Sequence, residues 1–490
     1  MKNITIIGGG LSGLVASCYL AKNNFNVTII DKNESMGGRL SSFKKDGFTF
    51  DMGPSWYWMP EVFEDFFNDF DKKVNEYYKL ERLDPSYKFF FKNKETLIPS
   101  EYEKLKKVFD DEEKNSSKKL DDFLTKSKKK YDISMSGFIQ LPNISIKEYL
   151  SSFVIKNFLF LDFFISLRSL IAKYFKNKNI KKMLEFPSMF LGGTPKNTPG
   201  LYSLMNYADI KGGTWYPKGG MIEISKAFSK LSIELGVKHI NNVEIDNLKI
   251  DNGKIIQASS KSGKLFKSDI FLCCAEYPFV QKKLLNKKYR SYSNKYWNSR
   301  KVAPSALIFY LGFSEKIENL EHHNLFFDEN FDNHLDDIFI KKIWPREPLF
   351  YVCCPSKTDK TVVPKDNYEN IFILVPIGSG SNDNPQIREK YFKKIINRIE
   401  NKTGQNIKDK ILLKESFCVN DFKQRYNAFN GNAYGLANTL LQTAVFKPKI
   451  KDLKVENLFY TGHFTVPGPG LPPAIISGKI ASELIIKDFK

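Results

Sequence analysis

Three glycines near the start of the chain have the spacing of a dinucleotide-binding loop. Gly8, Gly10 and Gly13 follow the apolar run 4–7, which is typical of a buried parallel strand, and they lead into a helical pattern at 14–22. Gly8 permits a tight turn, Gly10 leaves room for a pyrophosphate beside the backbone, and Gly13 lets the helix pack closely on the strand. The helix N-terminus favours phosphate. The spacing therefore predicts a dinucleotide site, with a purely structural glycine turn as the alternative.

An acidic residue stands at a suitable distance from this loop. The second strand, 26–30, ends at Asp31, where a carboxylate can accept hydrogen bonds from an adenosine ribose. Gly38 and Arg39 follow, and they could bring backbone and a guanidinium close to a phosphate or a flavin edge. The alternative is an ordinary loop with a surface arginine. The turn that contains Ser55 adds a further loop, which NAD does not need but the longer FAD does.

A second strand, turn and helix occur far along the chain. The strand 457–461 ends at Gly462, a turn rich in Gly and Pro spans 466–473, and a helix is expected at 474–487. Glycines such as Gly470 allow close contact with a ligand, and the prolines fix the approach. This turn is predicted to form the opposite wall of the cofactor site, and a helix that only completes the fold is the alternative. The two walls together favour FAD.

The segment 149–173 is the most aromatic part of the chain. Its phenylalanines include Phe153, Phe160, Phe163 and Phe164, and the first, second and fourth of these recur at helical spacing. Charged residues interrupt the segment, so it is not expected to span a bilayer. It is predicted to lie in a membrane interface or to line an apolar channel, with a buried core helix as the alternative.

The composition limits the classes of function. With 490 residues, two or three domains are expected, and the net charge of +20 favours either an anionic membrane surface or lysines spread over solvated helices. No nucleic-acid motif is present, so we expect no nucleic-acid partner. We also expect no signal peptide, because the first strand starts almost at the first residue, and no transmembrane helix.

Cysteine and histidine positions predict no metal site. Six cysteines indicate a reducing compartment, and two adjacent pairs, Cys273–Cys274 and Cys353–Cys354, lie in strand-like runs. Neighbouring side chains on a strand point to opposite faces, so such a pair cannot share one metal ion. The five histidines have no metal-ligand spacing, and no His–Asp pair or carboxylate pair indicates a catalytic base. Buried thiols are the expected state.

Several longer motifs add a family resemblance. They are the stretches 8–39 and 50–55, YPKGGM at 216–221, YVCCPSKTD at 351–359, and 458–481 with PGPGLPPAIISGKIA. Together they resemble the bacterial-type phytoene desaturases of the carotenoid/retinoid oxidoreductase family, within the FAD-dependent amine oxidase-like superfamily. The resemblance covers nearly the whole chain.

The resemblance implies an α/β fold with a Rossmann-type FAD-binding domain, a discontinuous α+β substrate domain and a helical membrane-associating insert. The FAD-binding domain would consist of residues 1–90, 206–299 and 416–490. The substrate domain would consist of residues 91–205, with the insert, and 300–415, with a sheet.

The resemblance also implies roles for individual residues. The cofactor-binding residues would be Gly8, Gly10, Gly13, Asp31, Gly38, Arg39, Ser55, Val243, Gly462, Gly470 and Leu471. The substrate tunnel or membrane contact would use Phe160, Phe163, Phe164 and Gly220. In the wider superfamily an acidic residue often follows the glycine matching Gly462, whereas His463 stands here, which leaves one cofactor hydrogen bond unassigned.

The activity implied by the resemblance is removal of hydrogens from phytoene, towards lycopene or neurosporene, by hydride transfer to FAD in an apolar tunnel. Oxygen or a quinone would reoxidise the flavin. Alternatives are a C30 dehydrosqualene desaturase, a carotenoid isomerase, an amine oxidase and, outside the enzymes, a lipid-binding escort protein on the same fold. The expected location is cytoplasmic and peripherally associated with a membrane surface.

Overall fold

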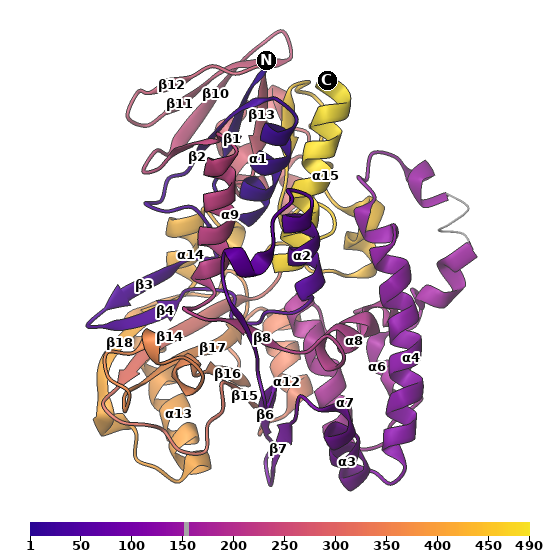
Figure 1. Cartoon of the computed structure of the whole chain (residues 1–490), viewed down its shortest axis with the longest axis vertical. Coiled ribbons are helices and arrows are strands. Elements are labelled where there is room, and N and C mark those ends of the chain that lie inside the picture. Colours follow the sequence, from indigo (N-terminus) through magenta and orange to yellow (C-terminus); the bar gives the residue numbers. More distant parts are fainter. Residues whose placement is uncertain (151–155) are drawn as a thin grey trace.

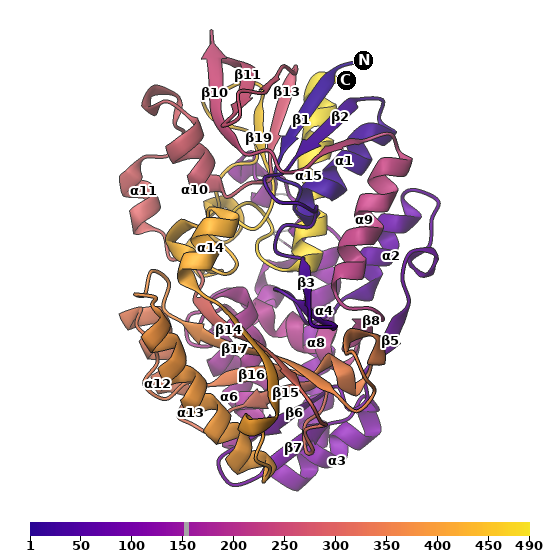
Figure 2. The same ribbon diagram turned by 90° about the vertical axis from the view of Figure 1, so that its left-hand side faces the viewer.

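The structure, a computed structural model that describes residues 1–150 and 156–490, has two large sheets towards opposite ends of the molecule (Figure 1). The first has five parallel strands in the order β19-β13-β1-β2-β9. These strands are β1 (Asn3–Ile7), β2 (Asn26–Ile30), β9 (Lys238–Ile240), β13 (Ile270–Cys273) and β19 (Leu458–Tyr460). Segments from the beginning, the middle and the end of the sequence thus form one sheet, and the two termini lie close together (Figure 2).

Both faces of the parallel sheet are covered, as its apolar strands require. Ile4 and Ile6 share an apolar cluster with helices, whereas Ile7 packs in a second cluster with a three-stranded antiparallel sheet. The helices are α1 (Leu11–Lys22), α9 (Ile222–Glu234) and α15 (Leu471–Phe489). The small sheet consists of β10 (Ile245–Asp251), β11 (Lys254–Ser260) and β12 (Leu265–Phe266). Ile6 and Ile7 pack in different clusters because successive side chains of a strand point to opposite faces of the sheet.

The second large sheet has seven strands in the order β18-β14-β17-β16-β15-β6-β7. They are β6 (Tyr87–Phe90), β7 (Glu95–Ile98), β14 (Ser305–Phe313), β15 (His323–Phe326), β16 (Phe350–Cys353), β17 (Glu369–Ile377) and β18 (Ile411–Phe417). One face packs on α13 (Pro385–Thr403), and the other faces the cluster that holds the helices of the first sheet. The structure differs from the predicted boundaries here, because β6 lies within 1–90 and β18 crosses residue 415.

Two strand pairs and several helices connect these sheets. The pairs are β3 (Ser42–Lys45) with β4 (Phe48–Asp51), and β5 (Leu80–Arg82) with β8 (Trp215–Pro217). The connecting helices are α2 (Pro60–Asn68), α10 (Tyr277–Phe279), α11 (Asn294–Ser299) and α14 (Val419–Tyr426), whereas α12 (Phe331–Leu335) links two strands of the second sheet, β15 and β16. A helical layer covers one side of the second sheet and consists of α3 (Tyr102–Glu112), α4 (Ser116–Met135), α6 (Leu167–Ala172), α7 (Lys178–Glu185) and α8 (Leu204–Ile210).

The aromatic segment is not the continuous helix that its spacing predicts. A short 3-10 turn, Phe158–Leu161, ends at Asp162, whose φ of 48° is left-handed, and α6 starts only after the N-cap residue Ser166. The Ser166 hydroxyl accepts a hydrogen bond from the Ser169 N–H, which fixes this new start. Phe153 lies outside the described residues. Among the described residues, no helix is both long and apolar enough to cross a membrane.

Candidate functional site

A cavity of about 540 Å³ lies between the two large sheets. One end is lined by the turn after β1, the carboxyl end of β2 and the turn before α15. The other end is lined by side chains of the second sheet and of the helical layer. In an open α/β sheet, ligands bind at the carboxyl ends of the parallel strands, which is where the first end lies.

The glycine loop has the geometry that the sequence predicts, with one difference. Gly8 has a φ of +100° and lies against the backbone of Ala275, at 2.8 Å from an added Cβ to its nitrogen, so a side chain is excluded there. Gly8 and Gly10 line the cavity. Gly13 does not, because it faces the Gly8 carbonyl, 2.7 Å from an added Cβ. Gly13 therefore permits helix packing, and the implied contact of Gly13 with pyrophosphate is not supported.

Asp31 and Val243 form the next part of the wall. The Asp31 carboxylate accepts hydrogen bonds from the N–H groups of Gly9, at 2.6 Å, and Asn33, at 2.7 Å. The Val243 N–H donates to the Asp31 carbonyl at 2.9 Å. Both residues line the cavity and are buried. These bonds hold a carboxylate at the end of β2 in a fixed orientation, as ribose recognition requires.

A buried carboxylate that sequence reasoning missed, Glu276, organises the centre of the site. Its oxygens accept hydrogen bonds from the Phe429 N–H at 2.9 Å and the Asn432 amide at 2.7 Å. Arg39 donates from Nη2 at 3.2 Å, and His463 contacts the same oxygen through Nε2 at 3.1 Å. Glu276 lies three residues after β13, whereas Asp31 directly follows β2, so the available signal was an acidic residue shortly after a buried strand.

The charges at this centre follow from burial and from the partners. Burial by itself would raise the pKa of Glu276, but Arg39, His463 and the Phe429 N–H outweigh it and lower the pKa to about 2. Burial, together with Arg39, lowers the pKa of His463 below its ordinary value. The site therefore contains an ionised Glu276, and because a carboxylate can only accept, His463 Nε2 carries the proton of their hydrogen bond. His463, which stands where an acidic residue often follows the glycine in the superfamily, supplies this donor.

Arg39 is held in place by two contacts, and its Nε–H is available to a ligand. Its guanidinium lies over the Tyr426 ring, 5.0 Å from the centroid, in addition to its bond to Glu276. Its buried Nε has no hydrogen-bond partner among the residues that the structure describes. Arg39 and Gly38 both line the cavity, so this nitrogen suits a phosphate oxygen of the cofactor.

The turn before α15 forms the facing wall. Gly462 has a φ of 110°, and its N–H donates to the Ser477 hydroxyl at 3.0 Å. Gly470 and Leu471 start α15 and, like Gly462, line the cavity. The structure thus brings the predicted residues of both walls, except Gly13, around one cavity.

The other end of the cavity is apolar and aromatic. Its lining includes Trp56, Trp58, Phe186, Phe190 and Tyr351, next to the predicted residue Ser55. Trp56 and Trp58 pack edge to face, with ring centroids 5.3 Å apart. Trp56 directly follows Ser55 in the sequence and Trp58 lies two residues further on, but neither was predicted to line the site.

The four residues implied for the substrate tunnel do not line this cavity. Phe160 and Phe164 are exposed, by 50% and 82%, and Phe163 packs beside Phe138, with ring centroids 5.6 Å apart. Gly220 lies in the turn before α9, where an added Cβ would lie 3.0 Å from the Asp51 carboxylate. These four residues are therefore not part of the cavity wall, and their contact with a substrate tunnel or a membrane stays a prediction.

The residues present fit FAD. The elongated cofactor needs glycines at its pyrophosphate, a carboxylate at its ribose and a second wall at its ring, and the cavity has all three. The family model described as flavin containing amine oxidoreductase matches residues 11–486. The chain belongs to this family. It is an FAD-dependent oxidoreductase, as predicted.

Curated relatives in the family match over almost the full length. A carotenoid 3,4-desaturase of Haloarcula japonica is 36% identical, over 100% of this chain and 99% of its own. A 4,4'-diapophytoene desaturase of Staphylococcus haemolyticus is 30% identical, over 99% of both chains. A zeta-carotene-forming phytoene desaturase of Myxococcus xanthus is 28% identical, over 99% of this chain and 94% of its own. These matches confirm the resemblance to the carotenoid desaturases.

Solved structures of low identity share the mixed α/β fold. Putrescine oxidase bound to putrescine superposes with a TM-score of 0.63 at 11% identity, over 99% of both chains. An oxidoreductase from Methanosarcina mazei superposes with a TM-score of 0.59 at 14% identity, over 98% of this chain and 100% of its own. These matches support the fold alone.

Proposed function

We propose that this protein is a carotenoid desaturase, which removes hydrogens from a long polyene such as phytoene. The observation that carries the proposal is the single cavity that joins the cofactor wall around Gly10 to an end lined by Trp56 and Trp58. A polyene has no polar group along its length, so its binding depends on apolar burial, worth roughly 25 cal/mol per Å². The names of the three relatives support the same substrate class.

The chain's own residues bind, orient and exclude water. FAD supplies the hydride acceptor that side chains lack, since an unactivated carbon–carbon bond needs a redox cofactor. The glycine loop and the turn before α15 hold the cofactor from two sides. The aromatic end can orient the polyene against the cofactor and keep water away from it. Oxygen or a quinone is proposed as the electron acceptor.

Expression in two hosts would test the substrate. We expect coloured product in a host that accumulates phytoene, while product only in a host that accumulates dehydrosqualene would support the C30 alternative. A third substrate, a carotenoid whose 3,4 bonds are saturated, tests for the 3,4-desaturation after which the Haloarcula relative is named. The matched control is Gly10→Val, which should give no product. If wild-type protein with bound FAD adds no double bond to any of the three substrates, the desaturase proposal is wrong; a change of configuration alone would then favour an isomerase, and no change at all an escort protein.

We also propose that the protein associates peripherally with a membrane surface through exposed apolar side chains near the aromatic segment. Ile146, Phe160, Phe164 and Leu441 are all exposed. The segment before residue 150 is tied to the one after 440, because the Asn143 amide donates to the Lys447 carbonyl at 3.1 Å. Exposed apolar groups flanked by lysines are suited to an anionic bilayer.

Sedimentation with anionic vesicles tests the membrane proposal. The double variant Phe160→Ser/Phe164→Ser should bind several-fold more weakly, because it removes exposed apolar area and leaves the charge unchanged. Phe163 is left intact because it packs against Phe138. The control is Ile256→Ser/Leu265→Ser, which removes exposed apolar groups from β11 and β12 on the opposite side of the molecule in Figure 1. Equal loss of binding in both double variants would contradict a specific membrane face.

A further inference from the structure

Three potential metal ligands meet behind the aromatic wall of the cavity. One ring nitrogen each of His322 and His323 and the Cys353 sulfur lie within 4.8 Å of one another, and all three residues are buried. The antiparallel register of β15 and β16 places His323 directly opposite Cys353. This pairing is not visible in the sequence, where the histidines and the cysteine are far apart.

Both imidazoles are already oriented through their Nδ1 atoms. His322 Nδ1 lies 2.8 Å from the Thr358 hydroxyl, and His323 Nδ1 lies 2.6 Å from the Tyr351 hydroxyl. The two Nε2 atoms are buried and have no hydrogen-bond partner within the described part of the chain. The side chains are 4% and 0% exposed. Two unpaired nitrogens in one buried place are unfavourable unless a ligand satisfies them.

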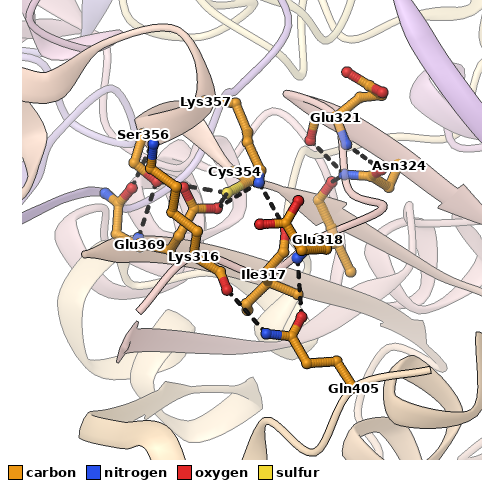
Figure 3. A network of polar contacts seen from close by, with 12 residues as sticks. Lys316, Ile317, Glu318, Glu321, Asn324, Cys354, Ser356, Lys357, Glu369 and Gln405 are labelled. Atoms are coloured by element: carbon orange, nitrogen blue, oxygen red, sulfur yellow. Dashed lines mark hydrogen bonds and ion pairs between the residues drawn. The ribbon is translucent and has the colours of Figure 1, made fainter. Parts of the chain in front are cut away.

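The neighbouring cysteine faces away from this group. Figure 3 shows the Cys354 thiol beside the Glu369 carboxylate, at 2.9 Å, with Lys357 contacting the same carboxylate at 3.2 Å. As predicted for adjacent residues on a strand, the two thiols point to opposite sides, so Cys353 alone can join the histidines. The spacing in the sequence did not reveal this group, because the fold brings the histidines and Cys353 together.

A small cavity lies beside Cys353. Its volume is about 10 Å³, and its lining includes Cys353, Asp51 and Ser55 but neither histidine. This is close to the minimum space for one water molecule, which needs about 10–15 Å³ and polar partners.

We propose that His322, His323 and Cys353 bind a Zn²⁺ ion through two Nε2 atoms and a thiolate. Nitrogen and thiolate ligands in a set of four are what Zn²⁺ prefers, whereas Mg²⁺ and Ca²⁺ prefer oxygen. The hydroxyls of Thr358 and Tyr351 accept from the two Nδ1–H groups, the usual arrangement around histidine ligands.

The ion would act on the shape of the cavity. The Trp56 ring stacks on His323, with centroids 4.2 Å apart and planes 13° apart, and Trp56 and Tyr351 both line the cavity. An ion bound to His323 would therefore hold this imidazole in place against Trp56 and Tyr351. This role does not depend on which substrate the enzyme uses.

Metal analysis of the purified full-length protein, after dialysis and addition of Zn²⁺, tests the site. We expect about one Zn²⁺ per chain, and at least a tenfold lower content in Cys353→Ser and in His323→Gln. Tyr351→Phe should weaken Zn²⁺ affinity by about 10- to 100-fold, because it removes the hydroxyl that contacts His323 Nδ1. Cys354→Ser and His239→Gln are matched controls from outside the group and should bind Zn²⁺ as the wild type does.

X-ray absorption at the zinc edge of the wild-type protein decides the case even if a variant fails to fold. The expected spectrum has one sulfur at about 2.3 Å and nitrogen or oxygen ligands at about 2.0 Å. Wild-type protein that takes up no Zn²⁺, a spectrum without sulfur, or an unchanged Zn²⁺ content in Cys353→Ser would each overturn the proposal.

Discussion

Gly10→Val is expected to yield folded protein that contains almost no FAD, instead of about one per chain. The backbone at Gly10, with φ of −68° and ψ of 169°, suits any residue, so the change does not strain the turn. An added Cβ lies 3.2 Å from the Cys274 sulfur, and the valine methyl groups would extend towards the cavity that Gly10 lines. Flavin absorbance per chain measures the effect.

Two further glycine variants separate cofactor exclusion from misfolding. Gly10→Ala adds only the Cβ and should lose part of the flavin. Gly404→Asn changes a left-handed residue after α13, where an added Cβ meets no atom within 4 Å, and should keep all of it. Circular dichroism should match the wild type throughout. Normal flavin content in Gly10→Val would show that this loop does not contact the cofactor.

Glu276→Ala is expected to lower the free energy of unfolding by about 3–5 kcal/mol, the usual cost of removing one partner of a buried ion pair. The substitution leaves Arg39, His463 and Asn432 without their common acceptor. Urea unfolding at saturating FAD measures the loss. The control Glu415→Gln removes a partly exposed partner of Lys45 and should cost much less. A cost for Glu276→Ala as small as that of the control would contradict the central role of this carboxylate.

The stabilisation by Glu276 should also depend on pH. The folded protein lowers its pKa from 4.5 to about 2, which corresponds to roughly 3 kcal/mol. Because the folded pKa is the lower one, this stabilisation is complete above pH 4.5 and is lost as the pH falls towards 2. The difference in unfolding free energy between wild type and Glu276→Gln should therefore shrink over that range. A constant difference would mean that the charge of Glu276 is not responsible.

The cofactor loop could be predicted from the sequence because its parts are local. Gly8, Gly10 and Asp31 belong to one unit of strand, helix and strand, whose geometry follows from short-range spacing. The turn around Gly462 has the same local character. In both places the residue types, the turn and the following helix all indicate the same unit of strand, turn and helix.

Features that depend on distant contacts could not be predicted in this way. Glu276 takes its role from Arg39 and Phe429, which lie far from it in the sequence. The pairing of His323 with Cys353 requires the register of β15 and β16. The prediction of a continuous helix in the aromatic segment failed for a different reason. A left-handed residue, Asp162, interrupts residues whose spacing is helical.

The strand order of the parallel sheet determines when the FAD site can form during synthesis of the chain. β1, synthesised first, ends up between β2 and β13, but β19 and α15 are synthesised last, and α15 packs on α1. The contact is close, since an added Cβ on Gly478 would lie 2.5 Å from the Ser12 carbonyl oxygen. A nascent chain on the ribosome thus has only one wall of the FAD site. The complete FAD site therefore forms only after the turn before α15 has been synthesised and has packed against the first wall.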